Sequence, residues 1–211
     1  MKNRLFVILS LLVYCFACVP KSGTTHDKTD EFLSENQLID NEKNDFPHFL
    51  SLFEDIKLPV ILDESFLNKN STSKKQPIDT AIVSLFIEKP KDADFFDYYT
   101  FYPMGKFHVS SSIIGVIYLK YGAAGGFEDY FILSLYSTSG EKMDELLVGE
   151  YAGDLGFVSL ITSIISQSEI SLVETYFERY EDEEGSDDYR EVSKKEKRYK
   201  IDTVHRKIEI Q

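Results

Sequence analysis

Positively charged residues are scarce in this chain of 211 residues. Lysine and arginine total 23 against 36 aspartate and glutamate residues, so the formal net charge is -13 at pH 7. Nucleic-acid binding needs cations that face the phosphates, and no basic stripe occurs along the chain. The composition therefore excludes a nucleic-acid-binding protein, and the acidity is explained by solubility.

Patterns that carry catalytic chemistry are also missing from the sequence. It contains no HExxH spacing, no cysteine–histidine cluster and no Gly-x-Ser-x-Gly elbow. The four histidines, at positions 26, 48, 108 and 205, show no pairing with a base or nucleophile. Residues 122–126 are rich in glycine, but Glu128 and Asp129 follow them and would repel a phosphate. We expect that segment to connect two strands, and we expect no cofactor.

The apolar run near the N-terminus is too short to span a bilayer comfortably. Residues 5–17 are apolar apart from Ser10, whereas a spanning helix needs roughly 20 apolar residues. Lys2 and Arg4 precede the run and the small residue Ala17 ends it, which is typical of a cleavable export signal. We therefore expect residues 1–17 to be a signal peptide.

Cysteine occurs only at positions 15 and 18. The segment 13–18, Val-Tyr-Cys-Phe-Ala-Cys, resembles the lipobox of bacterial lipoproteins, in which a small residue precedes a cysteine that receives a diacylglyceryl group. Ala17 and Cys18 match that pattern, whereas Cys15 and Phe16 depart from it. The resemblance implies a lipid anchor, palmitate or a similar acyl chain, at Cys18. Simple secretion, with cleavage after Ala17, is the alternative.

Cleavage before Cys18 would leave a mature chain that cannot form an internal disulfide, because Cys15 leaves with the signal. Residues 19–44 are polar and bury too little surface to offset their ordering entropy, so residues 18–44 are interpreted as lipidated cysteine and tether. No aspartate lies beside Cys18, which by the same resemblance suggests the outer membrane, on its periplasmic face. Residues 45–211 are then one domain.

The beginning of that domain has helical spacing. Phe49, Leu52, Phe53 and Ile56 recur at helical intervals, and Pro47 suits a first turn. The apolar segment 78–87 fits a helix or a buried strand, and we favour a helix because Pro77 precedes it. One or two short helices are therefore expected before the sheet.

Strand patterns dominate from residue 98 onward. Residues 130–136 and 143–151 flank a polar turn that ends in Gly140, and further strands are expected at 169–180, at 189–201 and around Ile208 and Ile210. Residues 113–121 are apolar on both faces, which predicts a central strand covered on both sides. Strand 169–180 alternates poorly, and a bulge near Val173 would repair its pattern. The predicted fold class is α+β, an antiparallel β-meander with short N-terminal helices.

Two clusters are candidate sites. The acidic stretch 181–188 could hold Ca²⁺ through Asp182, Glu184 and Asp187, but it lacks the ligand spacing of an EF-hand loop, and we favour a solvated hairpin tip. Aromatic residues crowd positions 95–102. Exposed, these side chains could stack on sugars or anchor a protein partner; buried, they belong to the core, which we favour because aromatic residues dominate core packing. The candidate residues are Phe95, Phe96, Tyr98, Tyr99 and Tyr102.

The mature region also resembles small uncharacterised lipoproteins of Gram-negative bacteria. The residues that carry this resemblance are 131–136, the turn to Gly140, 151–154 and 170–172. These are general strand and turn patterns, so the resemblance implies no activity. The favoured interpretation is a membrane-tethered, non-enzymatic binding or structural domain of the cell envelope, with an envelope protein or a glycan as partner. A carboxylate-based metal-dependent or glycan-active enzyme is the alternative, and carriage of a small ligand within the sheet is a third.

Overall fold

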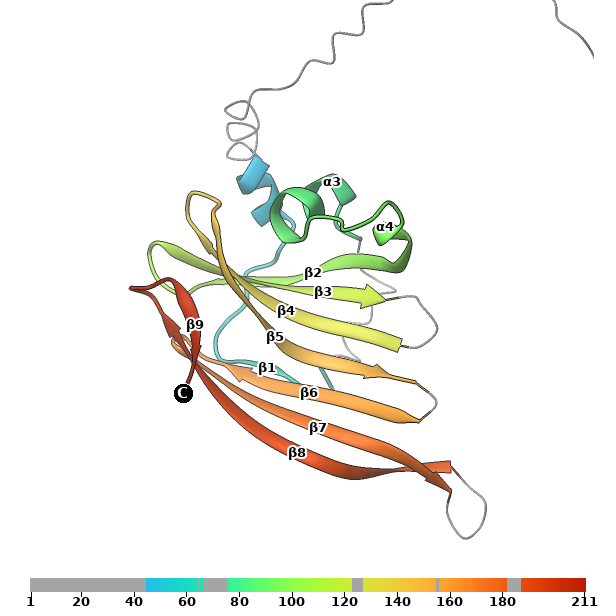
Figure 1. Cartoon of the computed structure of the whole chain (residues 1–211). Coiled ribbons are helices and arrows are strands. Elements are labelled where there is room, and N and C mark those ends of the chain that lie inside the picture. The colour runs from blue at the N-terminus through green and yellow to red at the C-terminus, as the bar shows by residue number, and fades with distance from the viewer. Residues whose placement is uncertain (1–44, 64, 67–75, 123–126, 155, 182–186) are drawn as a thin grey trace, which may run out of the picture. The chain divides into compact units, whose positions relative to one another are not determined.

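Strands that follow one another along the chain lie side by side in one antiparallel sheet, as the computed structural model shows (Figure 1). The structure describes residues 45–63, 65–66, 76–122, 127–154, 156–181 and 187–211. The sheet has the order β2-β3-β4-β5-β6-β7-β8-β9, and β1 pairs with β6 outside this path. The strands are β1 (Val60–Leu62), β2 (Tyr99–His108), β3 (Ile113–Gly122), β4 (Phe127–Ser137), β5 (Lys142–Gly153), β6 (Phe157–Ile165), β7 (Glu169–Glu181), β8 (Asp187–Asp202) and β9 (Lys207–Ile210).

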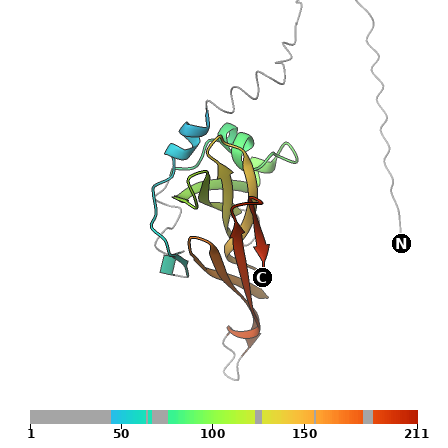
Figure 2. The same ribbon diagram turned by 90° about the vertical axis from the view of Figure 1, so that its left-hand side faces the viewer.

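The predicted antiparallel meander is confirmed, but the chain is mostly β rather than α+β. The described helices are short: residues 45–51, α3 (Thr80–Ile82), the π-helical turn η2 (Val83–Ile87) and α4 (Phe95–Tyr98). Helices of this length derive their stability from packing on the sheet, because an isolated helix shorter than about 12 residues is marginal in water. Figures 1 and 2 show them gathered at the β2 end of the sheet, away from β7 and β8. In the described ranges, no helix is long and apolar enough to cross a membrane.

Gly140 closes the hairpin between β4 and β5, as predicted from the sequence. Its φ of 93° lies in the left-handed region that residues with a Cβ rarely adopt, and a Cβ there would approach the Phe46 ring to 2.9 Å. The turn is closed by the Gly140 amide, which donates to the Ser137 carbonyl at 3.0 Å. The predicted strand 143–151 lies within β5.

Strand β3 is buried on both faces, which confirms the prediction for residues 113–121. It lies second in the order of the sheet, between β2 and β4, rather than at its centre. Ile113, Ile117 and Leu119 point to one face and belong to a first core. Ile114, Val116 and Tyr118 point to the opposite face and belong to a second core. The alternation of the strand thus supplies two separate layers of side chains.

The first core joins the strands of the sheet to β1. Its buried members are Val60, Leu62, Met104, Phe107, Val109, Ile113, Ile117, Leu119, Phe131, Leu133, Leu135, Val148, Ile165, Ile170 and Ile201. The second core joins the helices to β2, β3 and β4. Its buried members are Phe46, Phe49, Phe53, Ile78, Val83, Phe86, Ile87, Phe95, Phe101, Ile114, Val116, Tyr118 and Tyr136.

The first helix is shorter than its apolar spacing predicted. It begins by residue 45 and ends at residue 51, so Ile56 lies outside it. Phe49 and Phe53 pack in the second core, whereas Ile56 packs against the first. The chain must therefore change direction between them, and it runs beside β2, where the Ile56 amide donates to the Lys106 carbonyl at 2.9 Å.

The second helix was predicted correctly in type but not in its start. It begins at Thr80 rather than next to Pro77, because Asp79 is the N-cap and its side chain accepts from the Ala81 amide at 2.8 Å. The prediction of a bulge near Val173 was wrong. Strands β6 and β7 pair without a shift, and the irregularity lies between β7 and β8. Tyr176 and Phe177 face Ser193 and Glu191, so Val192 of β8 is the extra residue.

Candidate functional site

Lys120 lies where the second core meets the surface. The alternation of β3 places it on the same face as Val116 and Tyr118, near the end of the strand. The Lys120 ammonium is 4.3 Å from the centre of the Tyr99 ring and 5.2 Å from that of Phe95. Cations at this distance are attracted by the negative face of an aromatic ring. The α4 region and β2 thus form an aromatic wall around the amine.

Glu88 binds the same amine from the end of η2. Lys120 Nζ donates to Glu88 Oε2 at 2.7 Å, and the two side chains are only 16% and 27% exposed. Partial burial reduces the solvent screening that makes most surface ion pairs weak. The ion pair ties β3 to the segment that follows η2, two parts of the chain that are distant in sequence.

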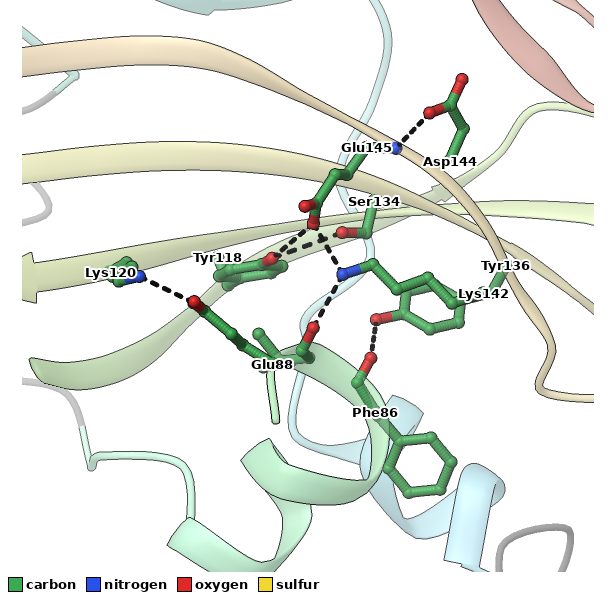
Figure 3. A network of polar contacts seen from close by, with 10 residues as sticks. Phe86, Glu88, Tyr118, Lys120, Ser134, Tyr136, Lys142, Asp144 and Glu145 are labelled. Carbon is green, nitrogen blue, oxygen red and sulfur yellow. Dashed lines mark hydrogen bonds and ion pairs between the residues drawn. The ribbon is translucent and has the colours of Figure 1, made fainter. Parts of the chain in front are cut away.

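A second polar network lies between the end of η2 and the sheet (Figure 3). The buried Ser134 hydroxyl donates to the Tyr118 hydroxyl, which donates to Glu145 Oε2, both at 3.4 Å. Lys142 Nζ donates to the same Glu145 oxygen at 2.6 Å and to the carbonyl of Ile87 at 2.7 Å. The network therefore connects β3, β4 and β5 with the last turn of η2.

The two buried tyrosines in this region act as neutral hydrogen-bonding groups. The Tyr136 hydroxyl donates to the Phe86 carbonyl at 2.6 Å (Figure 3). Burial raises the pKa of Tyr118 well above its usual value, and burial likewise raises the pKa of Tyr136. Both phenols stay protonated at physiological pH. They satisfy backbone and carboxylate acceptors and supply no nucleophile.

A hollow of about 360 Å³, which we name the Lys120 hollow, opens beside this amine. Tyr98, a residue that is 47% exposed, lines it, and Tyr99 forms part of the same wall. Carboxylates outnumber ammonium groups in its lining. The lining residues are Glu88, Lys91, Asp92, Phe95, Tyr98, Tyr99, Lys120 and Glu128. The hollow thus combines an accessible aromatic face with many hydrogen-bonding groups.

A second depression of about 270 Å³ touches the other side of Lys120. It is lined by Lys120, Tyr130, Ile132, Glu145 and Leu147. Burial raises the pKa of Tyr130, and the neighbouring carboxylates Glu128 and Glu150 act in the same direction. The Tyr130 hydroxyl on this side of Lys120 is therefore a protonated donor.

The structure separates the five aromatic residues that the sequence grouped as a binding candidate. Tyr98 and Tyr99 line the Lys120 hollow, and the buried Phe95 forms its inner wall. Phe96 packs against the second core, and Tyr102 packs against the first. The alternation of β2 explains the division, because Tyr99 points to the face of the second core and Tyr102 to the opposite face.

The remaining sequence candidates lie largely outside the described residues. Cys18, Asp182 and Glu184 belong to the part that the structure does not describe, as does the side chain of Asp187, whose backbone begins β8. Within the described ranges, no group of three or more histidine, cysteine or acidic side chains could hold a metal ion. His205 does have a partner, because its Nδ1 lies 2.8 Å from Asp202 Oδ2 in the turn before β9.

A wider hollow of about 440 Å³ lies between the first helix, the start of α3 and β2. Its apolar walls include Leu52, Ile82 and Met104, and its polar groups include His48 and Glu54. No ion pair or hydrogen bond between described residues joins His48 to Glu54 across this space. The polar groups here are less organised than those around Lys120.

Asp129 is a half-buried carboxylate near the start of β4. It stands opposite Tyr121 of β3 and Tyr151 of β5, and its buried Oδ1 has no hydrogen-bond partner among the described residues. Burial raises the pKa of this carboxyl above its usual value, because the charged form loses solvation. The protonated carboxyl is favoured in the folded state, so its contribution to the free energy of unfolding is fully present below the pKa of the unfolded chain. This contribution is lost as the pH rises through the higher pKa of the folded protein.

Asp129→Asn should therefore stabilise the protein at pH 7, where the native carboxylate is ionised. The expected gain is on the order of 1 kcal/mol, the scale of a buried polar group without a partner. At pH 3 the native carboxyl is already protonated, so the gain should vanish. Urea unfolding at both pH values measures the difference. The exposed Asp92→Asn is the control, and an equal gain at both pH values would contradict the assignment.

Sequence reasoning missed Lys120, Glu88 and Glu145 as site residues. The signal for Lys120 was present, since it is the one charged residue in the apolar segment 113–121. Its partners carried no comparable signal. Glu88 is 32 positions away, and Glu145 reaches the site only because β5 lies beside β4.

Comparison of the chain with known proteins gives no match. No family model, no curated protein and no solved structure is detectably similar to it.

Proposed function

We propose that this protein is a membrane-tethered lipoprotein of the cell envelope that binds a glycan, without catalysing a reaction, in the Lys120 hollow. The export signal at residues 1–17, the lipobox-like cysteine at position 18 and the polar segment 19–44 support the tether. We place it at the periplasmic face of the outer membrane. The organised hollow at one end of the sheet supports the binding role.

The exposed ring of Tyr98 is the observation that carries the proposal. A tyrosine presents an apolar face with a polar tip, which suits a ligand with both apolar C–H faces and hydroxyl groups. Tyr98 lines the hollow together with carboxylates that accept hydrogen bonds and amines that donate them. Sugars have this combination of surfaces. A large aromatic side chain that remains accessible beside a largely buried cluster is also typical of ligand sites.

The charges of the hollow favour an uncharged sugar over an ion. Its lining holds Glu88, Asp92 and Glu128 against two lysines, so an anionic ligand would meet an excess of like charge. A cationic ligand would compete with Lys120, which already lies over the Tyr99 ring and pairs with Glu88. A neutral glycan would neither add negative charge to the hollow nor displace Lys120 from Glu88.

Tyr98→Ala should weaken binding to insoluble chitin, an uncharged polymer of N-acetylglucosamine, about tenfold. A lost aromatic contact is worth roughly 0.5–1.5 kcal/mol beyond the area it buries, and 1.4 kcal/mol corresponds to a factor of ten. The full chain in detergent is sedimented with the polymer, and the bound fraction is measured against polymer concentration. Tyr98 is exposed, so its loss should leave the unfolding temperature unchanged.

Tyr176→Ala is the matched control. Tyr176 is 40% exposed on β7, outside the Lys120 hollow, and its removal should not change binding. Failure of the native chain to bind the polymer would contradict the glycan proposal. Recovery of an envelope protein by the native chain, lost in Tyr98→Ala, would replace the glycan by a protein at the same site.

A further inference from the structure

The smaller depression on the other side of Lys120 continues the Lys120 hollow. We name this space of about 270 Å³ the Tyr130 depression, and its lining is Lys120, Tyr130, Ile132, Glu145 and Leu147. Lys120 lines both spaces, so a ligand built of linked units can extend across its side chain from one to the other. Two neighbouring spaces with one common wall suit an oligosaccharide better than a single sugar.

Strand pairing places the lining of the Tyr130 depression on one face of the sheet. Tyr130 of β4 stands directly opposite Lys120 of β3, and these two strands pair without a shift. Ile132 follows two residues after Tyr130 and stands opposite Leu147 of β5. Glu145 lies two residues before Leu147, in a stretch of the ladder that has no irregularity, so it shares the same face.

The apolar side chains lie between the two polar ends of this depression. Ile132 and Leu147 are half-buried and form its floor. Glu145 stands opposite Ser134, four residues along β4 from Tyr130. Four strand residues span roughly 14 Å, and the Tyr130 and Glu145 side chains extend into the same space from its two ends. The remaining distance suits one sugar ring with a substituent.

Both polar ends have hydrogen-bonding capacity to spare. The Tyr130 hydroxyl has no hydrogen-bond partner among the described residues, and burial together with Glu128 and Glu150 keeps it protonated by raising its pKa. The carboxylate of Glu145 uses only Oε2 for its contacts with Tyr118 and Lys142. Its Oε1 atom accepts from no other described residue. A donor is therefore available at one end of the depression and an acceptor at the other.

We propose that the Tyr130 depression is a second sugar subsite that recognises an acetamido group, so that the glycan bound by this protein contains N-acetylhexosamine. The acetamido carbonyl accepts a hydrogen bond from the Tyr130 hydroxyl, and its methyl group packs on Ile132 and Leu147. At the other end, Glu145 Oε1 accepts from a hydroxyl of the same ring. The inference rests on the proposed function, since the adjacent sugar of the chain occupies the Lys120 hollow beside Tyr98.

The chemistry of the floor explains why the substituent is neutral and carries a methyl group. A free amino group or a carboxylate placed over Ile132 and Leu147 would lose solvation without an apolar contact in return. A plain hydroxyl offers no methyl, and its oxygen lies one bond from the ring, too near to reach Tyr130. The acetamido group supplies the methyl and carries its carbonyl oxygen farther from the ring.

Two soluble oligosaccharides test the recognition of the acetamido group. Chitotetraose and cellotetraose are uncharged and have the same linkage, but only chitotetraose carries acetamido groups. The native full chain in detergent should bind chitotetraose about tenfold more tightly, as titration calorimetry measures, because it alone gains the hydrogen bond and the methyl contact. Equal affinities would overturn this inference and leave glycan binding intact. Absence of binding to both would contradict the proposed function itself.

Tyr130→Phe removes the donor and keeps the ring. We expect the affinity for chitotetraose to fall about fivefold, the effect of one hydrogen bond, and that for cellotetraose to stay unchanged. Tyr189→Phe is the matched control, because Tyr189 is 43% exposed on β8, outside both spaces, and the loss of its hydroxyl should change neither affinity. An equal loss for both oligosaccharides in Tyr130→Phe would overturn the inference.

Leu147→Ala tests the methyl contact independently. Saturation transferred from the native chain to chitotetraose in nuclear magnetic resonance should be strongest at the acetamido methyl protons and should weaken there in the variant. The affinity for chitotetraose should fall about threefold, and retained binding of cellotetraose shows that the variant is folded. Saturation spread evenly over the native chain's ligand, or loss of both oligosaccharides by a folded variant, would contradict the assignment of this subsite.

Discussion

Replacing Cys18 with alanine is expected to abolish incorporation of labelled palmitate into this chain. Cys18 is the only thiol that would remain after cleavage behind Ala17. Each buried methylene contributes about 0.8 kcal/mol to membrane binding, so two or more acyl chains hold a protein firmly and their loss is close to all-or-none. Labelling of growing cells, followed by gel electrophoresis of the isolated chain, measures the effect.

Cys15→Ala is the control for this experiment. Cys15 lies in the expected signal peptide, so its replacement should leave labelling unchanged. A native chain that carries no label and is released into the medium would show simple secretion instead of anchoring. Equal labelling of Cys18→Ala and the native chain would place the lipid elsewhere.

Phe49→Ala is expected to destabilise the protein strongly. Phe49 is fully buried, and its ring lies 4.9 Å from Phe86, 5.1 Å from Phe53 and 5.5 Å from Tyr136 between ring centres. Removal of a buried phenylalanine costs about 3–5 kcal/mol. The loss detaches the first helix from the sheet, so the urea midpoint should fall strongly.

Two controls separate this packing effect from a general sensitivity to substitution. Phe49→Leu keeps much of the apolar volume and should cost less than half as much. Phe157→Ala removes a ring that is 61% exposed on β6 and should change stability by no more than about 0.5 kcal/mol. Equal midpoints for Phe49→Ala and Phe157→Ala would contradict the assignment of Phe49 to the second core.

The strands could be located from the sequence because their determinants are local. Alternating residues and the glycine at position 140 define the hairpin of β4 and β5, and successive hairpins build a meander without distant contacts. The first helix shows where local reasoning fails. Its spacing included Ile56, yet Ile56 packs on the opposite layer, and only the arrangement of both cores determines where the helix ends.

The bulge between β7 and β8 also could not be located from the sequence. Poor alternation in residues 169–180 predicted a bulge near Val173, but β7 contains no extra residue and pairs with β6 without a shift. The extra residue lies in the partner strand β8, at Val192. A bulge is defined by two paired strands, so the apolar pattern of one strand did not locate it.

The sequence by itself determined the antiparallel meander, the turn at Gly140 and a strand at 113–121 with two apolar faces, because each depends on residues close together in the chain. Tertiary structure decided which side chains surround Lys120, since Glu88 and Tyr99 reach it only after η2 and β2 pack against β3. It also decided which strand edge stays uncovered, because β9 is long enough to cover only the C-terminal end of β8. Contacts between distant segments depend on how whole layers pack, and no local spacing rule contains that information.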